Sequence, residues 1–350
     1  MKIFIPALKD ANSFFDEISI HSKHTFVYGN YTEYNETYKI VLLQWPEQLF
    51  AWKEPTSLEL INFEKSIKNW KNNSKIIHIA HNLERHFGMT PKFEKIYRIV
   101  QENCDVMVHF GDFSFNLFSE KYPDKLHKII NHPLYEKTFK VYDKKYAREK
   151  LNIKQDSVVI IAPGSIRNIE ERQMILNSFK NIPTKNKVLI VPRMFWLNFQ
   201  YEFKGRTLLK KVFDIKKVYE TYINEKKYKK PQYILGYKFL KNKELSLLMS
   251  AVDIVLIPRI NILNSGNLFL GLTFKKIIIG PKVGNIEEVL DTFDFPKFNP
   301  KNPKSISDAL IKGIDLLKTE NKIYKNVSLS KYKPKAIAEK WDHLCCNIIK

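Results

Sequence analysis

The chain has 350 residues, 44% of them hydrophobic, and a formal net charge of +21 at pH 7. This length predicts two domains, and the hydrophobic content is that of a globular protein with a buried core. No apolar run approaches the roughly 20 residues of a membrane-spanning helix, and the amino terminus lacks the pattern of a secretory signal. The three cysteines form neither a disulfide framework nor a metal-ligand spacing. We therefore expect a cytoplasmic protein.

The large positive charge limits the partners that the chain can have. Nucleic acid, or an anionic membrane surface with acidic substrates, would complement it. The basic residues are mostly lysines and are scattered, without an RNA-recognition signature or zinc-finger spacing. Lysines that only coat solvated faces explain the charge equally well. We expect no nucleic acid as a partner and retain an anionic membrane surface as a candidate.

The first third of the chain alternates between short apolar runs and segments with helical spacing. The runs predict strands at 2–7, 38–45, 75–80, 105–110 and 127–131. The segments between them predict helices at 12–21, 58–71, 91–103 and 113–121. This alternation is typical of βα units around a parallel sheet.

A second α/β series follows a polar, lysine-rich linker at 135–150, which carries a short predicted helix. Its predicted strands are 158–162, 187–191, 233–235, 252–257 and 276–280, and its predicted helices are 169–180, 207–224, 243–250 and a final one at 334–349. The predicted fold is α/β, with two Rossmann-like domains, 1–134 and 151–333, that face each other across a cleft. The carboxy-terminal segment 334–350 is a candidate to pack back onto the first domain.

Two loops of the second series are suited to bind phosphate. The segment from Pro258 to Asn267 follows an apolar strand, and Ser265-Gly266 then opens a helix. Serine is a favoured N-cap, glycine lets a ligand approach the backbone, and the free N–H groups of a first helical turn attract phosphate. The other loop runs from Ala162 to Arg167. Together the two loops indicate a nucleotide-sugar diphosphate held at the strand ends of one domain.

Ligands of open parallel sheets bind beyond the carboxyl ends of the strands. Polar residues directly after the predicted strands are therefore candidates to line the cleft. These are His81, Asp112, Gly164, Arg167, Arg193, Gly236, Arg259 and Ser265. Each also has an ordinary structural explanation as a turn residue, a helix cap or a salt-bridging arginine.

Four segments between about residues 75 and 290 follow one another in a recognisable order. They are Ile79-Ala80-His81-Asn82-Leu83-Glu84-Arg85-His86, Gly164-Ser165-Ile166-Arg167, Ile234-Leu235-Gly236-Tyr237 with Leu245 to Arg259, and Ser265-Gly266 with Gly284-Asn285-Ile286-Glu287-Glu288. In combination they resemble GT-B-type glycosyltransferases, and most of all the bacterial family-4-like enzymes that build capsule, exopolysaccharide or O-antigen chains. The resemblance implies a donor site in the second domain and an acceptor site in the first.

The resemblance also implies roles for individual residues. Arg167 would hold the diphosphate together with the backbone of Ser265 and Gly266, because a guanidinium offers paired donors to phosphate oxygens. The implied donor-binding residues are Gly164, Arg167, Arg193, Tyr237, Arg259, Ser265, Gly266, Asn267 and Glu288, the last accepting from ribose hydroxyls. The implied catalytic residues are His81, Glu84, His86 and Asp112, with Glu84, His86 and Asp112 as candidate general bases for an inverting reaction. No Asp-x-Asp triplet occurs, and we expect neither a metal nor a cofactor besides the donor substrate.

The sequence departs from the resembled family at three places. Leu263 and Gly271 occupy the positions of the Glu-x7-Glu pair of many retaining members, and Glu170 stands where a lysine often follows the arginine loop. The first loop reads Pro6-Ala7-Leu8-Lys9, without the usual glycine pair. The donor and the stereochemical outcome are therefore open, as is a poorly active member of the family.

We expect a metal-independent, hexosyltransferase-type enzyme that extends a lipid-linked glycan in surface polysaccharide synthesis, either cytoplasmic or peripheral on the inner face of the cell membrane. Two alternatives are a GT-B-fold sugar-nucleotide epimerase and a basic nucleic-acid-binding protein. The segments 58–71 and 113–121 mix aromatic residues with lysines and would suit an anionic membrane surface, although packing on the sheet explains the same pattern.

Overall fold

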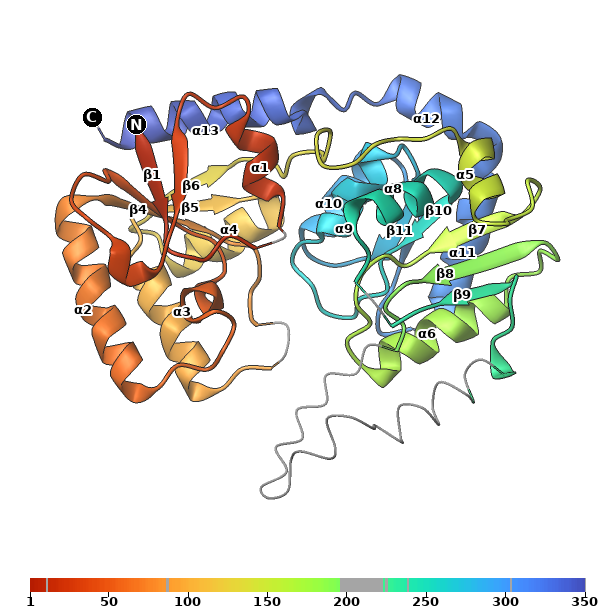
Figure 1. Cartoon of the computed structure of the whole chain (residues 1–350), viewed down its shortest axis with the longest axis horizontal. Helices are drawn as coiled ribbons and strands as arrows, with labels where there is room; N and C mark the ends of the chain where they lie inside the picture. The colour runs from red at the N-terminus through yellow and green to blue at the C-terminus, as the bar shows by residue number, and fades with distance from the viewer. Residues whose placement is uncertain are drawn as a thin grey trace, which may run out of the picture.

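The computed structural model describes residues 1–10, 12–85, 88–195, 223, 226–237, 239–302 and 304–349. They form two α/β domains side by side (Figure 1). Each domain is built on a six-stranded sheet, and every strand pairing in both sheets is parallel. The expected α/β class with two Rossmann-like domains is thus confirmed.

The first sheet has the strand order β2-β1-β3-β4-β5-β6. Its strands are β1 (Lys2–Ile5), β2 (Thr25–Tyr28), β3 (Ile40–Leu43), β4 (Lys75–Ile79), β5 (Val106–His109) and β6 (Leu126–Ile129). Its helices are α1 (Phe14–Ser19), α2 (Ser57–Asn73), α3 (Pro91–Asn103) and α4 (Asp112–Lys121). The apolar sides of α2, α3 and α4 cover one face of the sheet, where Phe63, Phe93 and Phe118 are buried. The central strands are buried on both faces, as parallel strands usually are.

The second sheet has the strand order β12-β11-β10-β7-β8-β9. Its strands are β7 (Val158–Ile161), β8 (Lys187–Val191), β9 (Tyr233–Leu235), β10 (Ile254–Leu256), β11 (Ile277–Pro281) and β12 (Lys297–Phe298). The described helices of this half are α5 (Lys144–Lys150), α6 (Ile169–Lys180), α8 (Asn242–Ala251), α9 (Gly266–Thr273), α10 (Gly284–Thr292), α11 (Lys304–Leu316) and α12 (Glu320–Asn326). One continuous apolar core joins sheet and helices.

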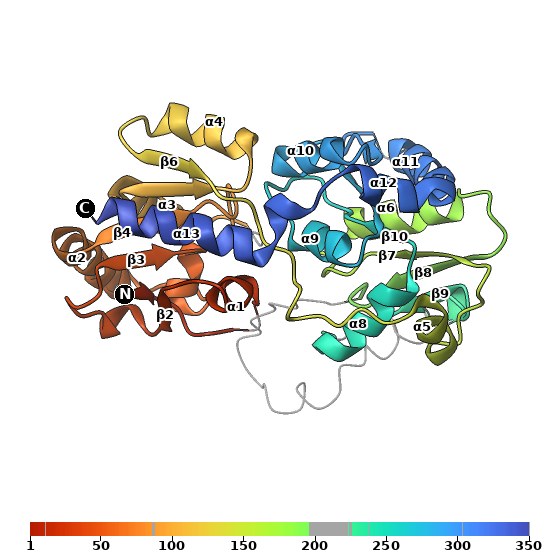
Figure 2. The same ribbon diagram turned by 90° about the horizontal axis from the view of Figure 1, so that it is seen from above.

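The last helix, α13 (Pro334–Ile348), returns to the first domain and lies across its sheet (Figure 2). Its apolar side, with Trp341 fully buried, packs beside α1 on the face opposite α2 and α3. Asp342 accepts hydrogen bonds from the hydroxyl of Ser22 at 2.5 Å and from the backbone N–H of Lys23 at 2.9 Å. The chain therefore begins and ends on the same domain.

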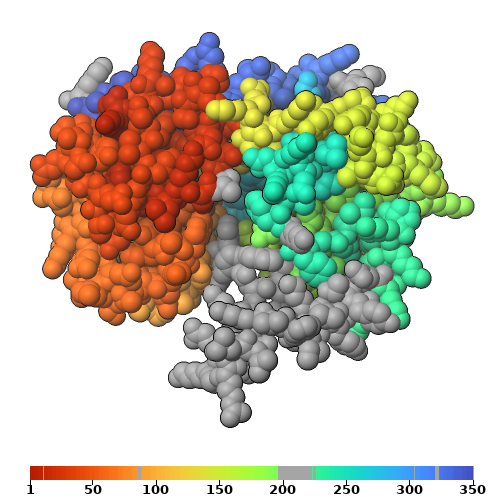
Figure 3. Space-filling model, in the orientation of Figure 1, coloured from red at the N-terminus to blue at the C-terminus, as the bar shows by residue number. Residues whose placement is uncertain are grey.

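The two domains meet along a seam (Figure 3), where polar contacts join them near α4 and α10. The side-chain amide of Asn264 donates to the backbone oxygens of Ala80 at 3.0 Å and His81 at 2.9 Å. Leu263, in the same loop, is buried in the core of the first domain. These contacts fix the loop after β10 against the end of β4.

Most predicted elements are present, with shifts at their ends. The half-exposed edge strand β2 and the two-residue β12 were not predicted, because the apolar run of β2 has only three residues and β12 has none. The predicted helix at 12–21 is shorter: α1 follows Ser13 as its N-cap, and the Asn12 side chain accepts from the backbone N–H of Phe14 at 2.9 Å just before the helix. The predicted helix at 113–121 begins one residue earlier, since α4 starts at Asp112. The predicted helix 207–224 lies, apart from residue 223, outside the described residues.

Candidate functional site

The strand order places one crevice in each sheet. In the first sheet β1 lies between β2, which follows it in the chain, and β3, which pairs with its other side. In the second sheet β7 is in the same way flanked by β8 and β10. Loops diverge at such switch points, and ligands of open α/β sheets bind there, beyond the carboxyl ends of the strands.

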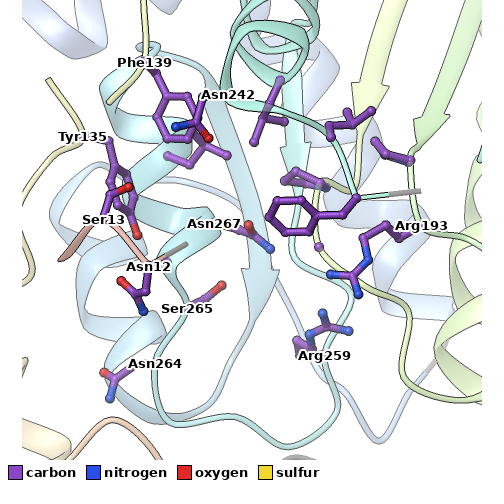
Figure 4. A pocket seen from close by; sticks show the side chains of 18 of the residues that line it. Asn12, Ser13, Tyr135, Phe139, Arg193, Asn242, Arg259, Asn264, Ser265 and Asn267 are labelled. Carbon is purple, nitrogen blue, oxygen red and sulfur yellow. The ribbon is translucent and has the colours of Figure 1, made fainter. Parts of the chain in front are cut away.

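A cavity of about 540 Å³ lies between the domains and is lined by the loops at both switch points (Figure 4). From the first domain come Asp10, Asn12 and Ser13, and from the segment that joins the domains come Tyr135 and Phe139, which pack against the core of the second domain. The second domain contributes the following polar residues: Gly164, Arg167, Arg193, Asn242, Arg259, Asn264, Ser265, Gly266 and Asn267. The two loops that the sequence indicated for phosphate thus open into one cavity.

Three arginines, Arg167, Arg193 and Arg259, form the cationic wall of this cavity. In Figure 4 the guanidinium groups of Arg193 and Arg259 lie on the same side, across from Asn12 and Tyr135. Burial lowers the pKa of Arg167 to about 10, and the neighbouring charge of Arg259 adds to this effect while Glu171 opposes it. Burial, and then Arg259, also lowers the pKa of Arg193. Cations that repel one another in a buried site favour an anionic ligand.

Glu171 holds this wall together from behind. Its side chain is 4% exposed, and its carboxylate pairs with the guanidinium of Arg259 and accepts a hydrogen bond from the backbone N–H of Arg167 at 2.8 Å. Arg259 donates in addition to the backbone oxygen of Ser165 at 2.7 Å. The loop after β7 is thus fixed by a buried ion pair. Sequence reasoning singled out the neighbouring Glu170, which is exposed, and missed Glu171.

The backbone at the cavity is crowded where the sequence has glycine. A Cβ at Gly164 would lie 2.6 Å from the amide nitrogen of Asn267 and 3.0 Å from a guanidinium nitrogen of Arg259. A Cβ at Gly266 would lie 2.8 Å from the hydroxyl of Tyr135. Ser265 is the N-cap of α9, but its side chain makes no capping hydrogen bond. The backbone N–H groups of the first turn of α9, at the positive end of the helix dipole, therefore face the cavity beside the three arginines.

The opposite wall is aromatic and belongs to the first domain. A chamber of about 120 Å³ adjoins the cavity and shares Asn12, Tyr135, Asn264 and Gly266 with it. His81 lines this chamber and is buried, with its ring stacked on Trp45 at 3.8 Å between centroids. The rings of Phe14, Phe110 and His132 complete the chamber. Such a surface suits the apolar face of a sugar ring.

His132 is held neutral within this chamber. Burial lowers its pKa to about 4. Its Nδ1 lies 2.7 Å from the backbone oxygen of Pro133 and therefore carries the proton, which leaves Nε2 to accept from the hydroxyl of Tyr135 at 3.4 Å. The same hydroxyl borders Gly266, so this network reaches the start of α9.

Tyr237 lies beside the main cavity rather than in it. It lines an adjoining, mostly apolar pocket of about 330 Å³ with Ile190, Pro192, Ile234, Leu235, Gly236, Leu240 and Leu248. Its buried hydroxyl has no hydrogen-bond partner among the described residues. Pro192 and Leu240 also border the main cavity, so a ligand there can extend toward this pocket.

Asp112 and Glu288 are not brought into the cavity, and here the expectation needs a correction. Gly111, the N-cap of α4, has no side chain to cap the helix. Glu288 of the other domain does so instead: its carboxylate accepts from the backbone N–H of Asp112 at 2.8 Å and from that of Phe113. Glu288 is thus engaged at the seam between the domains, and Asp112 is exposed at the same place.

The remaining predicted residues are more scattered. Glu84 lines a separate cavity of about 640 Å³, which Arg167 also borders. His86 lies outside the described residues. Gly271, at one position of the missing acidic pair, faces the sheet, where a Cβ would lie 2.8 Å from Ile278. No carboxylate fits there without a shift of the core.

Several cavity residues escaped the sequence reasoning, namely Asp10, Asn12 as a lining residue, Ser13, Tyr135, Asn242 and Asn264. A signal existed for Asp10, which follows the first strand as Arg167 follows β7. Within the described part of the chain, no three histidine, cysteine, aspartate or glutamate side chains gather as metal ligands. Nor does any described helix have the length and apolarity needed to cross a bilayer.

No protein-family model and no curated protein matches the sequence. Solved structures do match the fold. Anabaena HepE in complex with UDP and glucose has a TM-score of 0.68 over 99% of this chain and 99% of its own, at 9% identity. A glycosyltransferase from Rickettsia africae has a TM-score of 0.65 over 100% and 98%, at 11% identity.

Sucrose-phosphate synthase from Thermosynechococcus elongatus has a TM-score of 0.63 over 91% of this chain and 75% of its own, at 12% identity. At these identities the likeness is one of fold, and it extends over both domains and the returning helix α13. The chain has the GT-B fold of these glycosyltransferases.

Proposed function

We propose that this chain is a glycosyltransferase that moves a sugar from a nucleoside-diphosphate sugar to a glycan acceptor. One observation carries the proposal: three arginines and the uncapped start of α9 converge on a single cavity between two GT-B domains. The similar HepE structures contain UDP or UDP-glucose, which makes these compounds the first probes.

The cationic wall suits the leaving group of this reaction. When the bond from the anomeric carbon to the diphosphate breaks, negative charge grows on the phosphate oxygens. Arg167, Arg193 and Arg259 can stabilise that charge without reorganisation, because Glu171 and the crowded backbone already fix the wall. The arginines and the amides of α9 supply the positive charge that other enzymes take from a metal ion, and on this ground we propose a metal-independent reaction.

The aromatic wall suits the sugars. Trp45 and Phe110 offer apolar surface, and Asn12 and the buried His81 offer polar groups beside it. We propose a hexose-type donor sugar at the junction of the chamber with the cavity. A growing, lipid-linked glycan of a surface polysaccharide would enter from the side of the first domain.

Work on a lipid-linked acceptor would place the enzyme on the cytoplasmic side of a membrane, bound peripherally. Two helices of the first domain support this proposal. Leu58 and Ile61 on α2, and Phe113 and Leu117 on α4, are exposed, and lysines lie on both helices. The buried side chains of α2, such as Phe63 and Trp70, pack on the sheet, so only its outer side is available to lipid. Co-sedimentation with vesicles that contain anionic lipid measures this contact.

The donor is tested by thermal shift against UDP, GDP and ADP and their glucose conjugates. A ligand that binds only the folded protein raises the melting temperature. We expect one nucleotide series to stabilise the protein and Arg167→Ala to abolish most of the shift. Specific stabilisation by DNA or RNA, with none by nucleotide sugars, would contradict the proposal. Turnover of a nucleotide sugar to its epimer, without an acceptor, would replace glycosyl transfer by epimerisation.

A further inference from the structure

A row of aromatic rings leads from the surface of the first domain to the chamber beside the cavity. Trp52 is 42% exposed, and its ring centroid lies 5.9 Å from that of Trp45, which is partly exposed. Trp45 lines the chamber and is stacked on the buried His81 at 3.8 Å. We call Trp52, Trp45 and His81 the aromatic path. Its inner end lies in the chamber that Gly266, at the start of α9, also lines.

The backbone at Trp52 is held in a conformation that residues with a side chain rarely adopt. The 3-10 helix Pro46–Phe50 is followed by Ala51 and Trp52, whose φ angles are 50° and 68°. Glycine is the residue that favours such a helix end. The backbone N–H of Ala51 donates to the oxygen of Gln48 at 3.0 Å, which keeps the turn in place. The N–H of Trp52 donates likewise to the oxygen of Glu47 at 2.9 Å. A large exposed side chain held against this backbone preference is a candidate for function.

The elements beneath the aromatic path are fixed as well. Glu47, in the same 3-10 helix, is 1% exposed and accepts from the hydroxyl of Tyr97 on α3 at 2.8 Å. In the amide orientation that satisfies its neighbours, Asn82 accepts from the indole N–H of Trp45 at 3.0 Å. Rings that are already fixed lose little freedom when a ligand covers them, which favours binding.

We infer that the aromatic path binds the acceptor and that the acceptor is a saccharide chain, an inference that rests on the function proposed above. Sugar rings carry C–H groups on their faces, and aromatic surfaces with a few polar groups beside them suit such ligands. The sugar that receives the transferred residue lies in the chamber, and the sugars behind it cover Trp45 and then Trp52. A saccharide chain therefore binds more tightly than a single sugar.

Exposed tryptophans also serve as anchors at membrane interfaces. A lipid contact needs only an exposed side chain, however, and Trp52 has more than that. Its ring contacts Trp45, and Trp45 in turn contacts the buried His81, so the row of rings runs from the surface into the molecule. This continuity with the chamber favours a glycan over a lipid surface.

The test compares Trp52→Gly with Trp52→Phe. Glycine accepts a positive φ, so the turn is kept while the ring is lost, and phenylalanine keeps a ring. Phe113→Ala is the matched control, because Phe113 is 45% exposed on α4 and is not part of the aromatic path. The probes are maltotetraose, cellotetraose and chitotetraose, beside glucose and N-acetylglucosamine, each with and without UDP. Binding is followed by NMR of the indole N–H groups, and thermal unfolding measures the stability of each variant.

We expect the signals of Trp45 and Trp52 to shift and those of Trp70 and Trp341, which are buried in the core, to stay. At least one tetrasaccharide should bind wild type and Phe113→Ala about 10-fold more tightly than its monosaccharide, as a tryptophan contact at an interface typically contributes. Trp52→Gly should lose this advantage with unchanged stability and unchanged affinity for single sugars, and Trp52→Phe should retain much of it. A residue that only shapes the turn would change the stability and not the dependence on chain length.

Two results would overturn the inference and leave the proposed function standing. One is the absence of indole shifts with every tetrasaccharide at about 10 mM, which fills even a site of millimolar Kd. The other is equal binding of the tetrasaccharides by wild type and Trp52→Gly. If Trp52→Gly instead lost co-sedimentation with vesicles of phosphatidylcholine and phosphatidylglycerol and kept its saccharide binding, Trp52 would belong to a membrane contact. Saccharide binding at both tryptophans of a wild-type protein that binds no nucleotide sugar would remove the proposed function and leave the aromatic path as a glycan site.

Discussion

The two walls of the cavity differ in the chemistry of their side chains. The wall from the second domain is ionic: Arg259 and Glu171 form a buried pair, and the loop with Arg167 is fixed to the same carboxylate. The wall from the first domain is aromatic and uncharged apart from Asp10, with His81 stacked on Trp45. Charge is thus concentrated where a diphosphate would leave, and apolar surface where a sugar ring would lie.

The same contrast runs through the interior of each domain. Buried ion pairs occur in the second domain, where Arg148 and Asp253 approach to 2.7 Å. Buried neutral histidines occur in the first, where His78, His109 and His132 have lowered pKa values because of burial. The two halves should therefore respond differently to mutation and to pH.

The largest effect is expected from Arg259→Met. It leaves the carboxylate of Glu171 buried without its partner, which typically costs about 3–5 kcal/mol of stability. Adding Glu171→Gln removes the stranded charge but keeps an acceptor for the N–H of Arg167, so the double variant should regain much of that stability. Denaturant unfolding measures the free energy of unfolding of the single and the double variant. Binding of UDP should stay weak in the double variant, and wild-type affinity there would show that the ionic wall does not serve the ligand.

Acidification should act mainly on the first domain. The pKa values of His78 and His132 lie at about 4 and that of His109 at about 3, all below the usual 6.5. Below pH 6.5 the unfolded chain therefore binds protons that the folded chain does not. The free energy of unfolding is therefore unaffected by these histidines above pH 6.5 and decreases as the pH falls toward 4. At pH 5.5 the decrease is on the order of 1 kcal/mol for each histidine.

Thermal unfolding between pH 8 and 5.5, with hydrogen exchange to locate the unfolding domain, measures this loss. His78→Leu should flatten the dependence on pH, whereas His343→Gln, on the exposed side of α13, should leave it unchanged. If the second domain unfolds first on acidification, the histidines are not the cause.

Arg167→Ala should weaken binding with little effect on folding, because Glu171 holds the backbone of residue 167 rather than its side chain. A hydrogen bond to a charged group contributes about 1.5–3 kcal/mol, so the affinity for UDP should fall about 10- to 100-fold. Isothermal titration measures the affinity. Arg98→Ala, on the exposed side of α3, is the control. A similar loss in both variants would mean that net charge, and not the site, attracts the nucleotide.

Much of the fold was predictable because local signals agreed with the packing. The expected ranges 91–103 and 169–180 are those of α3 and α6, whose caps Thr90 and Asn168 precede an amphipathic segment. The arginine loop was found because it directly follows the buried strand β7, and the start of α9 because Ser265-Gly266 ends the loop that leaves the buried strand β10.

Asp10 was missed for a topological reason. Its place at a switch point depends on β2, the edge strand that pairs with the outer side of β1. β2 is half exposed and its apolar run, Phe26-Val27-Tyr28, is only three residues long, so the strand was not predicted and the crevice beside β1 was not foreseen. Asp112 and Glu288 were misplaced because their partners belong to the other domain, which no local pattern identifies.

The smallest effect concerns the contact that joins the two walls at the seam. Glu288→Ala removes the cap of α4, and loss of a helix cap costs about 0.5–2 kcal/mol. The amides of Asp112 and Phe113 should then exchange hydrogen faster, while Asn285 still accepts from Ser114 at 3.0 Å and limits the opening. Glu287→Ala is the matched control, because Glu287 lies on the same helix and pairs with Lys297 of its own domain. Equal exchange in the two variants would mean that Leu263, Asn264 and Asn285 hold the domains together, and that the capped end of α4 contributes nothing to their alignment.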